Sequence, residues 1–258
     1  MKLLLLAGLI ISDIACVHEH KPEVSPLRNN PSESTSPFHP RIADIPVPEG
    51  FFRREAAGNS FPGWLRNLPL KKDRTVYLYN GQKKKNQLAQ YVVLDISTGN
   101  RDIQQCADAV IRLRAEYFFE KKNEVPISFI DFSGKEYRWN GGHNRQQFDN
   151  YLANVFGWCG SASLEKQMKK VMNAEDMQPG DVFVKGGFPG HAVIVADMAE
   201  NASGEKIFML AQGYMPAQDI HVLVNPLDAE GGPWYYLTDA DKIYTPEWTF
   251  NIEQLKRW

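Results

Sequence analysis

The sequence predicts an α+β fold for residues 49–258, with mainly helices and hairpins in the first half and an antiparallel sheet in the second. Apolar residues at helical spacing recur before residue 160, and four apolar runs follow residue 180 with polar or glycine-containing turns between them. Strands and helices do not alternate as they would in a parallel sheet. The fold class therefore rests on the order of the elements.

Residues 1–15 have the pattern of a secretory signal, because a positive residue precedes an apolar run, 3–11, that is too short to cross a bilayer. Ala15 directly precedes Cys16, which resembles the cleavage site of bacterial lipoproteins, although Asp13 stands where such sites usually have an apolar residue. We therefore expect export to the bacterial cell envelope and a membrane anchor through lipid on Cys16. Ordinary secretion is the alternative.

Residues 16–48 are rich in proline, serine and charge, which predicts a disordered tether, and residues 49–258 form one predicted domain. The chain has 29 lysine and arginine and 31 aspartate and glutamate residues, a net charge of −2. This balance gives no reason to expect nucleic acid as a partner. No glycine-rich phosphate loop and no C-x-x-C pair occurs, so we expect no cofactor.

The first half of the domain contains three predicted helices and two predicted hairpins. Ser60 can cap a short helix over 61–65, and Asn80-Gly81 provides a tight turn after a strand over 75–79. The remaining predicted elements are a strand over 87–96, a helix over 103–118, a hairpin over 127–139 and a helix over 148–156.

The second half begins with a short helix that starts at Ser161 or Ser163 and continues with the predicted sheet. Its four apolar runs are separated by short turns, as expected for neighbouring antiparallel strands. The predicted strands cover 182–185, 191–197, 207–211 and 220–224.

Cys106 and His191 are the strongest candidates for catalytic residues. A thiol becomes a nucleophile only when a base or a helix N-terminus favours its thiolate, and His191, at the mouth of a predicted strand, is a candidate base. Gln212, on the following strand, could orient the imidazole. Gln105, or its neighbour Gln104, could donate to a developing oxyanion.

The order of Cys106, His191 and Gln212 resembles the papain-like cysteine hydrolases of bacterial envelopes. The phrase GDVFVKGGFPGHAVIV is similar to a signature of the CHAP and NlpC-type amidases and endopeptidases, over residues 179–212. This resemblance implies a papain-like helix packed on an antiparallel sheet, and a cysteine amidase or endopeptidase that acts on cell-wall peptides. Residues 49–258 as a whole resemble an uncharacterised bacterial lipoprotein family, a domain of unknown function, in RDIQQCADAVIRLRAEY and LAQGYMPAQDIHVL.

Three observations keep other interpretations open. Asn100 or Asp102 is the plausible cap of the helix, and Asp102 and Gln105 form the D-x-x-Q pair of a capping box. With Asp102 as the cap, Cys106 lies at the fourth helical position, away from the helix end. Apolar neighbours make Cys106 a candidate for a buried core thiol. Cys106 and Cys159 could also form a disulfide, which would exclude Cys106 as a nucleophile.

Two further alternatives concern the class of function. His143, His191 and His221 could form a three-histidine zinc site, although their spacing does not favour one, and we expect no metal. A non-catalytic envelope lipoprotein that binds glycan or protein partners on the same scaffold is the main alternative to a hydrolase of cell-wall peptides.

Overall fold

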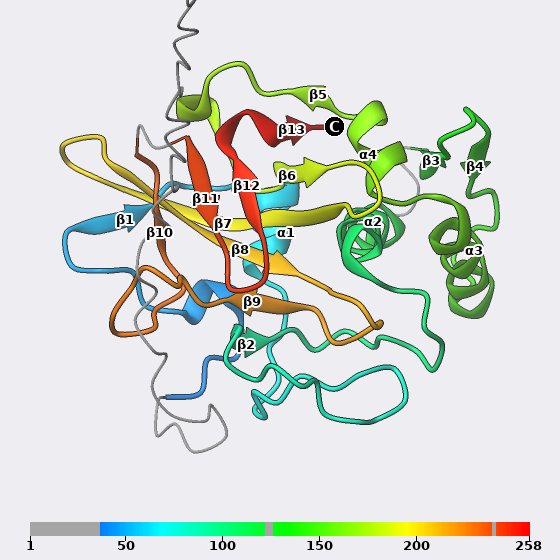
Figure 1. Ribbon diagram of the computed structural model, residues 1–258, viewed down its shortest axis with the longest axis horizontal. Helices are drawn as coiled ribbons and strands as arrows, with labels where there is room; N and C mark the ends of the chain where they lie inside the picture. Colours follow the sequence, from blue (N-terminus) through cyan, green and yellow to red (C-terminus); the bar gives the residue numbers. More distant parts are fainter. Residues whose placement is uncertain (1–36, 122–125, 239–240) are drawn as a thin grey trace, which may run out of the picture.

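The computed structural model describes residues 37–121, 126–238 and 241–258 (Figure 1). The predicted signal over 1–15, Cys16 and most of the predicted tether lie outside the described residues, so these predictions stay untested. Within the described ranges, none of the helices is long and apolar enough to span a bilayer.

One antiparallel sheet dominates the described part of the chain and contains nine of its strands. Its main path runs β2-β9-β8-β7-β6-β13-β5, while β1 pairs with β7 and β10 pairs with β8. These strands are β1 (Phe51–Arg53), β2 (Gln90–Val93), β5 (Lys169–Lys170), β6 (Val182–Lys185), β7 (His191–Asn201), β8 (Lys206–Gln212), β9 (His221–Leu223), β10 (Tyr235–Tyr236) and β13 (Leu255–Arg257).

The other elements are short apart from two helices. Two separate hairpins pair β3 (Ser128–Ile130) with β4 (Glu136–Arg138), and β11 (Lys242–Tyr244) with β12 (Thr249–Asn251). The helices are α1 (Phe61–Arg66), α2 (Cys106–Glu120), α3 (Arg145–Trp158) and α4 (Ser161–Gln167), with 3-10 turns η2 (Ile42–Asp44), η3 (Ala174–Asp176) and η4 (Ile252–Gln254).

Both faces of the central strands are buried. Alternate residues of β6 and β7 enter two apolar clusters: Val184 and Ile194 pack with residues of α2 and α3, whereas Phe183 and Val193 pack with the β11–β12 hairpin. In Figure 1 this hairpin lies in front of the sheet and α1 lies behind it. Because both faces are covered, β6 and β7 are continuous apolar runs instead of alternating ones.

The expected papain-like α+β fold is wrong. The structure is mostly antiparallel sheet, and its helices are few and mostly short. The strands β6 to β9 form where the sequence predicts them, whereas β1, β5, β10 and β13, which complete the nine-stranded sheet, were not predicted. Strands of two or three residues are too short to show a period-two pattern, so the sheet was underestimated.

Several local predictions are confirmed. The Ser60 side chain accepts a hydrogen bond from the Gly63 amide and caps α1, and the β3–β4 hairpin, α3, α4 and strands β6 to β9 form where expected. The predicted hairpin over 75–96 is wrong, because residues 75–79 form only the isolated bridges of Tyr77 and Leu78, and β2 pairs with β9. Long-range pairing, which the local pattern does not encode, decides this strand's position.

A buried carboxylate on strand β7 binds the N-terminal elements β1 and α1. Asp197 has no exposed surface and accepts hydrogen bonds from the Nε atoms of Arg53 and Arg66, each at 2.5 Å. Arg66 lies at the end of α1, and Arg53 ends β1. A single carboxylate therefore joins β1, α1 and β7.

Candidate functional site

Cys106 is the first residue of α2, not the fourth. Gln105 is the N-cap residue, and its backbone N–H donates to the Asp108 side chain at 3.0 Å. The expected Asp102 cap is wrong, because the Asp102 carboxylate accepts instead from the Ala217 amide at 2.7 Å and from the Gln105 side chain at 3.1 Å. The thiol therefore lies at the positive end of a helix 15 residues long.

Two glycines let the surrounding segments approach Cys106. A Cβ atom on Gly213 would lie 3.0 Å from the Gln105 carbonyl oxygen, and one on Gly190 would lie 2.2 Å from the Ser161 hydroxyl. The chain that follows β8 thus packs against the start of α2, and the turn before β7 packs against the start of α4. Both close approaches require the absence of a side chain.

The sulfur of Cys106 contacts the backbone on both sides of His191. It lies 4.0 Å from the carbonyl oxygen of Gly190, and the amide of Ala192 is among the groups that favour its thiolate. His191 begins β7 and is fully buried, with the Tyr214 ring centroid 5.0 Å from its own. The structure therefore brings the predicted nucleophile to the backbone that flanks the predicted base.

Gln212 contacts His191 as predicted. Its Oε1 lies 2.9 Å from Nε2 of His191, and its Nε2 donates to the Glu247 carboxylate at 2.8 Å. The same Nε2 lies 3.3 Å from Nε2 of His221, the residue that faces Gln212 on β9. Because the amide nitrogen faces Glu247, which can only accept, the amide oxygen must face His191.

These contacts fix the tautomer of both histidines. Nδ1 of His221 lies 2.9 Å from the Asp219 carbonyl oxygen and must carry a proton, so its Nε2 accepts from Gln212. His191 in turn must carry its proton on Nε2, because that atom faces the Gln212 oxygen. Nδ1 of His191 then holds a lone pair, and this buried atom has no hydrogen-bond partner among the described residues.

A buried lysine completes the network. Nζ of Lys84 lies 2.6 Å from the Glu247 carboxylate and 5.6 Å from the centre of the Tyr214 ring. Burial lowers the pKa of Lys84, although the Glu247 charge opposes this shift. Lys84 therefore pairs with the same Glu247 carboxylate that accepts from Gln212. The side chains of Lys84 and Glu247 are only slightly exposed.

The thiol and the imidazole are both neutral near pH 7. Burial raises the pKa of Cys106 to about 11, helped by the nearby Asp108 carboxyl, while backbone amides oppose the rise. Burial lowers the pKa of His191 to about 4, although the hydrogen bond that its Nε2–H donates to the Gln212 oxygen opposes this shift. A preformed thiolate–imidazolium pair is therefore disfavoured, and the imidazole is available as a neutral general base.

The side chain of Gln105 does not point to an oxyanion site, because its amide nitrogen donates to the Asp102 carboxylate. Gln104 is 1% exposed; its oxygen accepts from Arg112 at 3.3 Å, and its amide nitrogen is without a partner in the described part of the chain. Lys84 and Glu247 also belong to the site, although the sequence did not predict either of them. Neither has a local motif, since each comes from a segment that only the fold brings to Gln212.

The alternative sites are not assembled. Cys106 and Cys159 are both free, so they do not form the disulfide that was considered. His143 lies against the Phe119 ring, apart from the pair formed by His191 and His221 through Gln212. Over the ranges that the structure describes, no group of three or more histidine, cysteine or carboxylate residues could hold a metal ion.

Comparison with known proteins identifies one family model. The model described as "Domain of unknown function (4846)" matches residues 42–143 and 139–257. No curated protein matches the chain, and no solved structure does.

Proposed function

The chain belongs to this family of domains of unknown function, and from the geometry of its candidate site we propose that it is a cysteine hydrolase of amide bonds. Cys106 is the nucleophile in this proposal, His191 the general base, and Gln212 the residue that positions the base. The observation that carries the proposal is the fixed tautomer of His191, which leaves a basic lone pair on Nδ1 within a buried site.

The reaction uses the neutral pair. Nδ1 of His191 takes the thiol proton while the Cys106 sulfur attacks the carbonyl carbon, and the first-turn amides of α2 stabilise the oxyanion. The C–N bond breaks, the leaving amine takes the proton from the imidazolium, and a thioester remains. Water, deprotonated by His191, then hydrolyses the thioester and regenerates the thiol.

Cell-wall peptides are the proposed substrates. The similarity of residues 179–212 to CHAP and NlpC-type amidases supports this choice, as does the signal-like pattern of residues 1–15. Lipid on Cys16 would hold the domain at a membrane surface in the cell envelope. Full-length protein should enter a detergent phase and take up labelled fatty acid, whereas Cys16→Ser should do neither; equal aqueous partition of both would refute the anchor.

A non-catalytic domain that binds envelope glycan or protein partners is the second candidate. The burial of the two candidate catalytic residues favours a binding function, because Cys106 is only 8% exposed and His191 has no exposed surface. A substrate carbonyl must reach the sulfur, so catalysis requires the segments around Cys106 to open. A binding function would not require such an opening.

The activity is tested on whole sacculi and on soluble peptide fragments of the cell wall. Wild-type protein should release new amino groups, and Cys106→Ala or His191→Ala should abolish the release. Cys159→Ala is the matched control, since it removes another buried thiol that lies outside the site, and it should retain activity. Binding of sacculi without turnover by the wild type would instead support the second candidate.

A further inference from the structure

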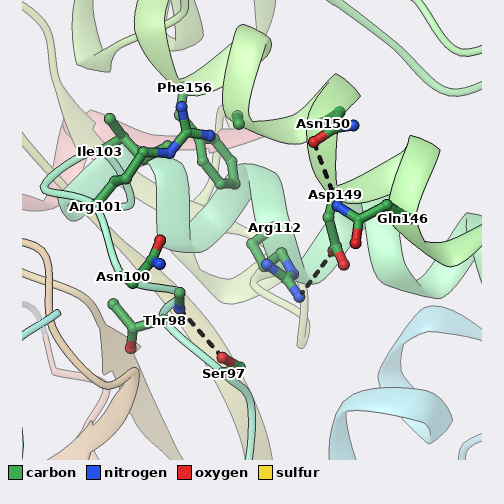
Figure 2. Close-up of a pocket in the computed structure, with 12 residues that line it drawn as sticks. Ser97, Thr98, Asn100, Arg101, Ile103, Arg112, Gln146, Asp149, Asn150 and Phe156 are labelled. Carbon is green, nitrogen blue, oxygen red and sulfur yellow. Dashed lines mark hydrogen bonds and ion pairs between the residues drawn. The ribbon is translucent and has the colours of Figure 1, made fainter.

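A polar pocket lies on the outer side of α2, between the loop over 97–103 and helix α3 (Figure 2). It has a volume of about 430 Å³, within the range of small-molecule sites. Side chains of the loop face those of the helix across the pocket, and Arg112 of α2 lies between them. The loop contributes Ser97, Thr98, Gly99, Asn100, Arg101 and Ile103, and α3 contributes Gln146, Asp149, Asn150, Ala153 and Phe156.

Two of the three charged groups in the wall are already paired inside the protein. Arg112 donates to Glu116 at 2.5 Å and lies 3.8 Å from Asp149. Asp149 also pairs with Arg145, the first residue of α3. These charges neutralise each other and do not call for a charged ligand.

Arg101 is the exception. Its side chain is exposed in the wall of the pocket, and its guanidinium forms no ion pair with any described residue. A guanidinium binds a carboxylate with two parallel hydrogen bonds, which makes arginine the residue suited to planar anions. The pocket therefore has one unmatched positive charge.

The uncharged part of the wall favours a ligand rich in amide or hydroxyl groups. The hydroxyl of Ser97 and the side-chain amides of Asn100, Gln146 and Asn150 can both donate and accept hydrogen bonds, and the Thr98 hydroxyl can accept one. Ile103, Ala153 and Phe156 add an apolar part of the wall. Such a mixture of a few polar groups with an apolar surface is typical of ligand sites.

We propose that this pocket binds a small ligand that carries one carboxylate on an amide- or hydroxyl-rich framework, with Arg101 as its counter-ion. A peptide with a free C-terminus and a carboxylated amino sugar share this chemistry. The proposal goes beyond the hydrolase function and holds whether or not Cys106 is a nucleophile.

The pocket is connected to the candidate site through its own loop. The hydroxyl of Thr98 donates to the Asp219 carboxylate at 3.3 Å, and the Asp219 carbonyl fixes His221. The same loop runs on through Asp102, which holds the Ala217 amide, to the N-cap of α2. A ligand seated in the pocket would therefore lie beside the segment that leads directly to Cys106.

Calorimetric titration of the full chain with four probes tests the proposal. The probes are N-acetyl-alanyl-alanine, its C-terminal amide, N-acetylmuramic acid and N-acetylglucosamine. At least one of the two acids should bind, and its neutral counterpart should bind at least tenfold more weakly. The acid that binds identifies the framework.

Four variants locate the site. Arg101→Gln should abolish the preference for the acid, whereas Arg138→Gln, an exposed arginine outside the pocket, should not. Ala153→Trp should fill the pocket and prevent binding, whereas Asn154→Trp, exposed on the same helix, should leave binding intact. Circular dichroism confirms that each variant folds.

Three results would overturn the proposal: no binding of either acid at millimolar concentration, equal binding of acid and neutral probe, or an unchanged preference in Arg101→Gln. Cys106→Ala should retain binding, because the sulfur is not part of the pocket wall. Loss of turnover in that variant with retained binding separates this proposal from the hydrolase function.

Discussion

His191 owes its tautomer to the orientation of the Gln212 amide, which both Glu247 and His221 fix. His221 accepts from the Gln212 amide because the Asp219 carbonyl holds the His221 proton on Nδ1, and the orientation of that amide then decides which nitrogen of His191 is basic. Gln212 was identified in the sequence as a candidate orienter, but its function in this network depends on groups that sequence spacing does not connect. Hydrogen bonds between distant segments are therefore the part of the site that could not be predicted.

Alkylation of the native protein should report the neutral state of Cys106. Because burial raises the pKa of Cys106 to about 11 and that of Cys159 to about 12, both thiols should react slowly at pH 7. The rate at Cys106 should rise about tenfold per pH unit up to pH 9 and exceed that at Cys159. Mass spectrometry after iodoacetamide treatment measures both rates; a rate plateau at neutral pH would reveal a thiolate and contradict the neutral pair.

The stability of the folded protein should fall in mild acid because of His191. Its pKa is about 4 in the folded state and 6.5 in the unfolded chain, so the unfolded chain binds the proton first as the pH falls. The contribution is complete above pH 6.5 and is lost as the pH approaches 4, with a total on the order of 3 kcal/mol. Urea unfolding from pH 7 to 4.5 should show a smaller loss in His191→Gln; equal losses would contradict the assignment.

At the scale of elements, the contact between the turn before β7 and the start of α4 depends on Gly190. A methyl group there would lie 2.2 Å from the Ser161 hydroxyl and 2.6 Å from the Gly187 carbonyl oxygen. Gly190→Ala should therefore destabilise the fold by about 1–3 kcal/mol through overpacking. The displacement should also move the backbone that contacts the Cys106 sulfur.

Chemical denaturation of Gly190→Ala measures this effect against Gly157→Ala. Gly157 lies within α3, and an added Cβ atom there meets nothing within 4 Å. This control should be neutral or more stable by roughly 0.5–1 kcal/mol, because alanine is the better helix former. Equal stability of Gly190→Ala and wild type would show that the turn can move aside at no cost.

The start of α2 shows why local capping signals failed near the site. Asp102 and Gln105 have the sequence of a capping box, and their side chains do touch, but the Asp102 carboxylate is shared with the Ala217 amide. The helix therefore begins at Cys106, three residues later than the motif indicates. The contact of Asp102 with the distant Ala217 amide takes the place of the local cap. Ser60 makes no such distant hydrogen bond among the described residues and caps α1 as its sequence predicts.

At the scale of the whole molecule, the buried carboxylate of Asp197 joins the N-terminal segments to the sheet. Asp197→Asn leaves Arg53 and Arg66 without their shared counter-charge, so the variant should lose about 3–5 kcal/mol of stability. Thermal and urea unfolding measure the loss. Asp95→Asn, at an exposed carboxylate, is the control and should change stability by less than about 0.5 kcal/mol.

The central strands could be predicted because both of their faces are buried, which leaves long apolar runs in the sequence. The edges could not be: Lys169–Lys170 and Leu255–Arg257 are mostly polar, and only the main-chain pairing in the folded state makes them strands. The same limitation applies to Glu247, which joins the site from a loop between β11 and β12. Apolar patterns within a segment predict the central strands of the sheet. The edge strands and the position of Glu247 depend on contacts between distant segments, which such patterns do not encode.

The position of β13 has a consequence for how the protein is made. This strand, from residues 255–257, lies between β6 and β5 in the sheet, although both of those strands are synthesised long before it. At about 5–20 residues per second, a ribosome leaves the edge of β6 open for several seconds before its partner emerges. A chain cut short by a premature stop keeps that edge open permanently, so truncated products should be preferred clients of chaperones and prone to pair with one another.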